Sequence, residues 1–290
     1  MKVAIIIWAL LIGTVYAQSK AGFYVVGGKV ITVQDTSSRN YLKAIENAGV
    51  VPSVTQNAAS NFLVTSEKAI GSYSLMTAQY PFIGGTGATH VFNLNNPNGL
   101  ASGFTLQFWG TVNHSANGIQ SDGTTGYADT KINANVNLTY NNTHLSHYSN
   151  IASVNENRGD IGVYGTTIDD RLLLTHNYGG SYFSDLYTYL TGRVAVASDT
   201  KTGLLIGTRT SSTSHNLFKN GVLIGSSSQT VGGVLPSRNI FLMAINGVGG
   251  SIGDLSNRPT QYVSIGLGFT NSISIQQSRA VTFFNSMQNR

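Results

Sequence analysis

Acid–base chemistry needs ionisable side chains at a set spacing, and this chain has few carboxylates to offer. Hydrolysis of a glycosidic bond requires two carboxyl groups about 5 to 9.5 Å apart. Of the three glutamates, Glu46 and Glu67 fall in a stretch with helical spacing, which leaves Glu156 alone in the rest of the chain. Asp169 and Asp170 are neighbours, so on a strand their side chains point to opposite faces. The sequence predicts no catalytic residue and favours a protein that is not an enzyme.

Two other patterns are similar to known sites, but both favour a structural role. Gly249–Gly253 matches G-x-S-x-G, which marks a nucleophilic serine only between a parallel strand and a helix; here it lies in a glycine-rich loop. His144 and His147 are three residues apart in a predicted strand, so they face opposite ways and make a poor metal pair. The chain has no cysteine, which excludes disulfides, thiolate metal sites and a cysteine nucleophile. None of these patterns predicts a metal.

Asp122 and Asp129 are the candidates for a calcium site. Both lie in sequence rich in turn residues, and Ca²⁺ accepts carboxylate and carbonyl oxygens from turns. An aspartate that only stabilises a turn looks the same in sequence, and we favour that interpretation. Calcium is therefore the one cofactor that the sequence leaves open.

Aromatic side chains are the best candidates for contact with a ligand. Tyr187 and Tyr189 alternate with leucines, so one face of a strand would carry the tyrosines and the other the leucines. If the leucines face the core, these tyrosines are exposed, and a tyrosine ring offers a sugar an apolar face and a hydroxyl. Tyr178 and Tyr182 lie just upstream. These four tyrosines are the candidate carbohydrate-binding residues; cross-strand packing or a subunit contact is the alternative.

The composition predicts that strands, not helices, position these side chains. Charged residues make up 10% of the 290 residues and hydrophobic residues 41%, whereas an ordinary soluble domain carries about 25% charge. Gly, Asn, Ser and Thr fill the other positions, and they suit short strands joined by turns. The net charge of +5 includes no run of Lys or Arg, so nucleic acid is not an expected partner.

The first residues are typical of a secretory signal. Residues 1–17 combine a lysine, an apolar run and small residues at the expected cleavage point. The run is short for a membrane span, which needs about 20 apolar residues. A cleaved signal is therefore favoured over a retained anchor, and membrane contact is expected only if this segment is retained.

Residues 18–83 are predicted to form a hairpin, at 23–33, followed by helices. Helical spacing begins near Ser38 and again near Thr55, and continues until Pro81. Short amphipathic helices need a partner for their apolar faces. The sandwich, the hairpin or neighbouring subunits are the options, and the low charge favours the last. We expect residues 38–78 to be an assembly element of an oligomer.

Residues 84–290 are predicted to form an antiparallel sandwich with no helix except one at the C-terminus. Alternating runs of four to eight residues are separated by turn residues. Asn220-Gly221 supply the two positive-φ positions of a type I′ hairpin turn. The final helix is expected from about Ser274, with an apolar stripe formed by Ala280, Phe283, Phe284 and Met287.

Three segments of the chain resemble virion-associated proteins of tailed and related bacteriophages: YPFIGGTGATHVFNLNNP at 80–97, GYADT at 126–130 and THLSHYS at 143–149. The likeness extends through 216–225 and the closing helix, so it covers roughly residues 35–290. It implies a concanavalin A-like, or laminin G-like, jelly-roll sandwich behind a small helical segment. It also implies a place on the virion surface and no enzymatic activity.

The signal-like N-terminus departs from that family, whose members seldom carry one. It leaves open a secreted bacterial protein or a virion protein that meets a membrane during assembly. The leading hypothesis is a non-enzymatic virion surface protein that assembles with itself or with other virion proteins and binds host glycans. A secreted bacterial carbohydrate-binding module is the second hypothesis, and a polysaccharide hydrolase is the third. The expected location is the virion surface or the extracellular space.

Overall fold

The computed structural model describes residues 23–26, 29–32, 34–98, 103–152, 157–167, 170–187, 192–230 and 234–290. The segment 1–17, and with it the predicted signal, lies outside the described residues, as do Glu156, Asp169 and Tyr189. Within the ranges given above, no helix is long and apolar enough to cross a membrane.

The larger of two main sheets has nine strands. Seven follow the order β12-β11-β10-β9-β16-β7-β4, and β17 joins β9 and β18. Every pairing is antiparallel except that of β17 with β9. The strands are β4 (Gln107–Trp109), β7 (Tyr127–Asn133), β9 (Ile161–Tyr164), β10 (Arg171–Tyr178), β11 (Ser181–Leu186), β12 (Val194–Ala197), β16 (Asn239–Leu242), β17 (Ile245–Asn246) and β18 (Ile252–Gly253).

The second main sheet is fully antiparallel and has six strands in the order β15-β14-β13-β8-β19-β3. These are β3 (Met76–Tyr80), β8 (Thr143–Ser149), β13 (Gly203–Ser211), β14 (Ser214–Lys219), β15 (Val222–Ser227) and β19 (Tyr262–Gly266). Two separate hairpins complete the strands: β1 (Phe23–Val26) with β2 (Lys29–Thr32), and β5 (Val112–Ser115) with β6 (Gly118–Ser121).

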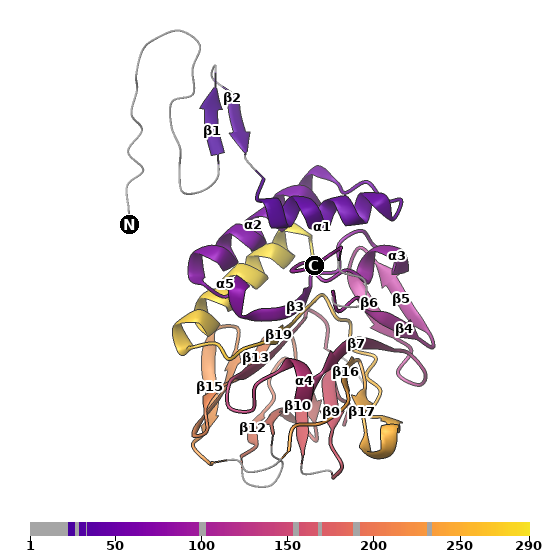
Figure 1. The fold of residues 1–290 in the computed structure, drawn as a ribbon, viewed down its shortest axis with the longest axis vertical. Coiled ribbons are helices and arrows are strands. Elements are labelled where there is room, and N and C mark those ends of the chain that lie inside the picture. Colours follow the sequence, from indigo (N-terminus) through magenta and orange to yellow (C-terminus); the bar gives the residue numbers. More distant parts are fainter. Residues whose placement is uncertain are drawn as a thin grey trace.

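Three helices lie together over the six-stranded sheet (Figure 1): α1 (Thr36–Asn47), α2 (Val54–Ile70) and α5 (Asn271–Met287). Each begins after a polar residue whose side-chain oxygen accepts a backbone N–H, which satisfies a donor that the helix cannot satisfy itself. These N-cap residues are Asp35, Ser53 and Thr270. The short elements are α3 (Gly87–His90), α4 (Ala134–Asn137) and the 3₁₀ turns η1 (Tyr73–Leu75) and η2 (Val248–Gly250).

Two hydrophobic cores hold these layers together. One lies between the sheets and includes Leu145 and Leu205; the other lies between the six-stranded sheet and the helices and includes Tyr148 and Phe284. All seven residues of β8 are buried, because this central strand is covered on both faces. The predicted fold class is confirmed in its main features: the chain is mainly β, with two largely antiparallel sheets packed as a sandwich and a small helical segment before it.

Several element predictions need correction. Residues 76–80 form strand β3 at the edge of the six-stranded sheet, so the expected helix does not continue to Pro81. The expectation of no helix between residue 84 and the C-terminal helix is also wrong, because α3 and α4 form single helical turns. The last helix begins at Asn271, before Ser274, since Thr270 caps it. Alternation of apolar and polar residues predicts strands, but helices of four residues, such as α3 and α4, are too short to show a helical period.

The helices' apolar faces are covered by the sandwich itself. Tyr41, Ile45 and Leu63 share one core with Ile206 of β13 and Tyr262 of β19. The prediction that neighbouring subunits cover these faces is therefore wrong for the buried residues. Because that prediction was the argument for an oligomer, the oligomeric state stays a prediction without this support.

The predicted hairpin turn at Asn220-Gly221 is confirmed. Lys219 pairs with Val222 across the turn, and φ is 50° at Asn220 and 81° at Gly221. Both residues thus have the positive φ that a type I′ turn requires. The turn lies against α5: a Cβ placed on Gly221 would come 3.3 Å from the carbonyl oxygen of Ile275.

Replacing Gly221 by valine is expected to lower the free energy of unfolding by about 1–2 kcal/mol, because a β-branched residue is strained at positive φ. Urea unfolding followed by circular dichroism measures the change. The control is Gly253→Val, since no atom lies within 4 Å of a Cβ at Gly253. Equal stability of Gly221→Val and the unchanged protein would contradict the strain argument.

Candidate functional site

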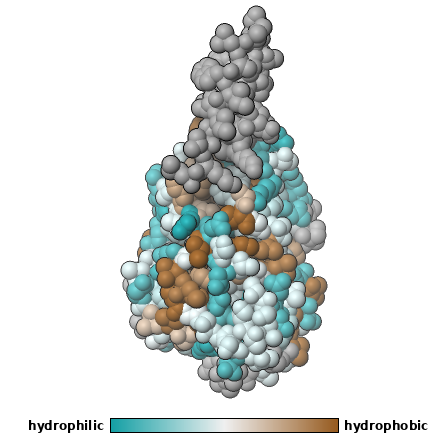
Figure 2. Space-filling model, turned by 90° about the vertical axis from the view of Figure 1, so that its left-hand side faces the viewer, coloured by the Kyte–Doolittle hydropathy of each residue, from teal (hydrophilic) through white to brown (hydrophobic). Residues whose placement is uncertain are grey.

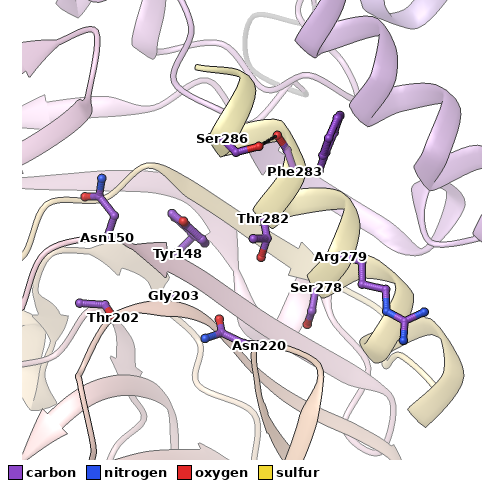
Figure 3. Close-up of a pocket in the computed structure, with 10 residues that line it drawn as sticks. All are labelled: Tyr148, Asn150, Thr202, Gly203, Asn220, Ser278, Arg279, Thr282, Phe283 and Ser286. Atoms are coloured by element: carbon purple, nitrogen blue, oxygen red, sulfur yellow. Dashed lines mark hydrogen bonds between the residues drawn. The ribbon is translucent and has the colours of Figure 1, made fainter. Parts of the chain in front are cut away.

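A groove with a volume of about 630 Å³ runs between α5 and one end of the six-stranded sheet, formed there by the ends of β8 and β13 and the turn between β14 and β15. Figure 3 shows Ser278 and Thr282 pointing from α5 towards Asn220, while Tyr148 lies across from the helix on the sheet side. The ten residues that line the groove come from three strand ends and one helix. They are Tyr148, Asn150, Thr202, Gly203, Asn220, Ser278, Arg279, Thr282, Phe283 and Ser286.

The sheet side of the groove is fixed by side-chain amides. Asn150 receives a hydrogen bond from the side-chain amide of Gln261, and its own backbone N–H donates to Gln261 Oε1 over 2.8 Å. Asn220 Oδ1 accepts the backbone N–H of Leu204 at 2.8 Å. Gly203 has a φ of 94°, and a Cβ there would meet Asn220 Oδ1 at 2.2 Å. A glycine is therefore required where the two chain segments meet.

The helix side of the groove adds a cation and an apolar rim. Arg279, Thr282, Phe283 and Ser286 are exposed on α5. The ring of Phe283 is 52% exposed, yet its centroid lies 4.6 Å from that of Phe62 on α2. A second groove of about 520 Å³ follows this contact between α2 and α5. Figure 2 shows apolar side chains gathered on this side of the molecule.

The lining groups are mostly hydrogen-bonding amides and hydroxyls, with one guanidinium. Amides and hydroxyls donate and accept hydrogen bonds, and a guanidinium pairs with carboxylates. None of the ten lining residues is an Asp, Glu or His. The pair of carboxyl groups that glycoside hydrolysis needs is therefore missing from this groove.

A buried polar cluster under the groove holds the 201–203 segment. Asp160 Oδ1 accepts from Ser256 Oγ at 2.9 Å and lies 3.4 Å from Arg258 Nε. Arg258 Nη1 donates to the Lys201 carbonyl oxygen at 2.6 Å. His176 Nε2 lies 3.1 Å from the Gly203 carbonyl oxygen. These contacts fix the backbone on both sides of Thr202, which faces the groove.

Charge within the cluster is balanced by an ion pair. Burial alone would raise the pKa of Asp160, but the adjacent Arg258 and the two histidines hold this pKa well below its usual range. Burial lowers the pKa of His147 to about 3 and also lowers that of His176. Near neutral pH the cluster thus combines a carboxylate and a guanidinium with neutral imidazoles.

The three described tyrosines among the four predicted to contact sugar do not form one exposed surface. Tyr182 is buried, with its hydroxyl donating to Asp199 and its ring under Lys219 Nζ. Tyr178 is half-buried, with its ring centroid 5.7 Å from that of Phe183. Tyr189 lies outside the described residues. None of the three placed tyrosines lines the groove under α5.

The expectation that Tyr187 is exposed is wrong. Its side chain is 2% exposed, and its hydroxyl lies 2.6 Å from Thr143 Oγ1. Strand β11 ends at Leu186, and Tyr187 follows it with a φ of 73°. The left-handed residue breaks the alternation, so Tyr187 points into the core beside Leu186 instead of away from it.

Asp122 and Asp129 have separate structural roles. Asp122 Oδ1 accepts the backbone N–H groups of Thr124, Thr125 and Gly126, and its Oδ2 accepts both threonine hydroxyls. These hydrogen bonds lower the pKa of Asp122 well below its usual range. Asp129 pairs with Lys131 at 3.0 Å. Asp122 thus stabilises its own turn, and both of its oxygens are already occupied by donors.

The structure also describes the G-x-S-x-G pattern and the two histidines of β8. Ser251 of the G-x-S-x-G pattern lies between η2 and β18, and its hydroxyl donates to the Val248 carbonyl oxygen. His144 and His147 face opposite sides of β8, as predicted: His144 stacks on Phe269, and His147 lies next to His176. The pairing of His147 with His176 was missed, because they lie on different strands.

The groove itself was also missed, although α5 carries a signal for it. Ser278, Thr282 and Ser286 recur every four residues and mark a polar face beside the apolar stripe. Tyr148 and Asn150 give no local signal, because they become neighbours of α5 only when β8 takes its place in the sheet.

No known protein family and no curated protein matches this chain in sequence. Among solved structures it is similar to domain 4 of AbnA, a GH43 extracellular arabinanase from Geobacillus stearothermophilus, in complex with arabinotriose, at 10% identity and a TM-score of 0.43. That match covers 70% of this chain and 98% of the other. It is also similar to the Ruminococcus gnavus IT-sialidase CBM40 bound to α2,3 sialyllactose, at 13% identity and a TM-score of 0.37, over 47% and 82% of the two chains.

The binding domain of botulinum neurotoxin serotype C1 is similar at 12% identity and a TM-score of 0.45. The match covers 74% of this chain and 52% of the toxin domain, so this chain spans about half of that domain's length. At such identities and TM-scores, these likenesses carry nothing about what this chain binds or does.

Proposed function

We propose that this chain is a non-enzymatic surface protein that binds glycans in the groove under α5. The observation that carries the proposal is the lining of the groove: amides and a hydroxyl on the sheet side, hydroxyls on α5, a tyrosine ring, a guanidinium and no carboxylate. Sugar hydroxyls both donate and accept hydrogen bonds, which amides and hydroxyls can satisfy. Tyr148 adds an apolar edge for the sugar ring.

Arg279 indicates which glycans are favoured. Its guanidinium has no ion-pair partner among the described residues, and it lies at the groove beside neutral polar groups. An exposed pair of this kind contributes about 0.2–1 kcal/mol. Acidic sugars are therefore expected to bind up to about fivefold more tightly than neutral ones of the same size.

The setting that we propose is the virion surface, supported by the sequence resemblance over residues 35–290. Self-association or contact with other virion proteins, and an extracellular target on a host cell, belong to the same proposal. A secreted bacterial carbohydrate-binding module is the alternative, favoured by the signal-like residues 1–17. The groove would serve the same chemistry in either setting.

Thr282→Trp tests the groove directly. Thr282 is exposed on α5 and points into the groove (Figure 3), so a tryptophan there fills the space without entering a core. We expect the variant to lose at least tenfold in affinity on an array of neutral and acidic oligosaccharides, with an unchanged melting temperature.

The matched control is Ser272→Trp, an exposed position on the same helix that does not line the groove. It should bind as the unchanged protein does. Binding that is indifferent to Thr282→Trp, or binding to no glycan on the array, would overturn the proposal. Release of shortened sugars would show an enzyme instead.

A further inference from the structure

We propose that His147, His176 and Asp160 supply three ligands of a structural metal ion of the zinc type between the two sheets. One ligand atom of each residue lies within 4.8 Å of the other two. His147 Nδ1 is 3.3 Å from His176 Nδ1, which is 3.1 Å from Asp160 Oδ2. Zinc bonds of about 2.0–2.1 Å give tetrahedral edges of roughly 3.3 Å, close to both separations.

The hydrogen bonds around His176 leave a lone pair where a metal would bind. Its Nε2 lies 3.1 Å from the Gly203 carbonyl oxygen, which can only accept, so Nε2 carries the proton. The neutral ring then presents an unprotonated Nδ1 to Asp160 Oδ2. Asp160 Oδ2 lies 3.1 Å from this Nδ1 and accepts the His176 backbone N–H at 2.7 Å. A cation bound between Nδ1 and Oδ2 would use the lone pair that the ring presents to the carboxylate.

The outer contacts are those that metal ligands usually have. A ligating histidine commonly donates its other ring N–H to a carbonyl or hydroxyl, and a ligating carboxylate is itself hydrogen-bonded. His176 Nε2 meets the Gly203 carbonyl and His147 Nε2 lies 2.9 Å from Thr260 Oγ1. The other Asp160 oxygen is held by Ser256 and Arg258. Each of the three ligands therefore has a hydrogen bond or an ion pair that fixes its orientation.

The location favours a structural ion over a catalytic one. The three ligands come from β8, from β10 and from the residue before β9, so the ion would join the facing sheets. All three side chains are buried, at 2% exposure or less, which means that the ion enters during folding. Arg258 is the only other charged group in contact with the cluster among the described residues, and it already pairs with the other oxygen of Asp160.

The test refolds the full chain from urea with Zn²⁺, with Co²⁺ or with EDTA, followed by dialysis. We expect close to one metal per chain, a melting temperature higher with Zn²⁺ than with EDTA, and the visible spectrum of tetrahedral Co²⁺. His176→Gln is expected to lose the metal. His144→Gln, which alters a buried histidine on the same strand but on its other face, should keep it.

Absence of bound metal from the refolded, unchanged protein would overturn the proposal. Equal metal content in His176→Gln and the unchanged protein would place the ion elsewhere and also overturn it. Should His176→Gln not fold, the metal content and cobalt spectrum of the unchanged protein still decide. Glycan binding at the groove is a separate measurement, so either proposal can fail alone.

Discussion

Replacing Asp160 by asparagine will lower the free energy of unfolding by about 3–5 kcal/mol. Asp160 and Arg258 are each 2% exposed, and Arg258 Nε lies 3.4 Å from the carboxylate. The substitution keeps the shape of the side chain but removes its charge, so a buried guanidinium loses its partner. Burial of an uncompensated charge is among the most costly changes in a protein interior.

Urea unfolding at neutral pH measures this loss. Glu46→Gln is the control, because Glu46 pairs with Lys43 on the exposed surface of α1 and such pairs contribute little. A change of less than about 1 kcal/mol for Asp160→Asn would show that the carboxylate does not neutralise Arg258. The 201–203 segment would then need another explanation for its position.

Glu67→Gln will make the chain more stable at alkaline pH, by up to about 3 kcal/mol. Glu67 is fully buried among Gln79, Tyr262 and Gln277, and no cation contacts its carboxyl group among the described residues. Burial raises its pKa from 4.5 to about 7, although hydrogen bonds from the neighbouring amides and hydroxyl oppose the shift.

The sign of the effect follows from proton binding. Between pH 4.5 and 7 the unfolded chain has released the Glu67 proton while the folded chain keeps it, so Glu67 lowers stability as pH rises. Above about pH 7 the carboxyl group of Glu67 is ionised in the folded chain as well, so Glu67 lowers stability no further. Glutamine is never charged, so the variant lacks this loss and differs little from the unchanged protein at pH 4.

The quantity to follow from pH 4 to pH 8 is the difference in the free energy of unfolding between Glu67→Gln and the unchanged protein. All six histidines have a pKa lowered by burial, and they make stability rise with pH over the acidic part of that range. A constant difference between Glu67→Gln and the unchanged protein at all pH values would show that Glu67 titrates normally.

Local sequence patterns predicted local structure well. Asn220 and Gly221 predict a turn because both residues readily adopt the positive φ that it requires. Runs of alternating apolar and polar residues predicted strands of both sheets. Strand β3 was predicted as the end of a helix because Pro81 was the expected stop, whereas α2 ends at Ile70 with Gly71 as its left-handed cap. Pairing with β19 decides its structure, and such tertiary context overrides local propensity.

The candidate site depended on contacts between distant segments. Asn150 and Gln261, or His147 and His176, meet only once the strands that adjoin or carry them have assembled. Tyr187 shows the converse: one residue with positive φ after β11 reverses the face that alternation predicts. Spacing identifies which residues could share a face of one element but not which faces come together.

Hydrogen exchange with a bound oligosaccharide tests the central claim most directly, because it shows where the ligand lies. We expect the glycan to slow amide exchange at 147–150, 201–204, 218–222 and 276–287, the segments around the groove, and to be recovered at full length. The rival surface is the exposed Trp109 on β4, which stacks on Tyr127. Protection at 107–109 and 127–131 instead of the groove, or a shortened oligosaccharide, would contradict glycan binding without cleavage under α5.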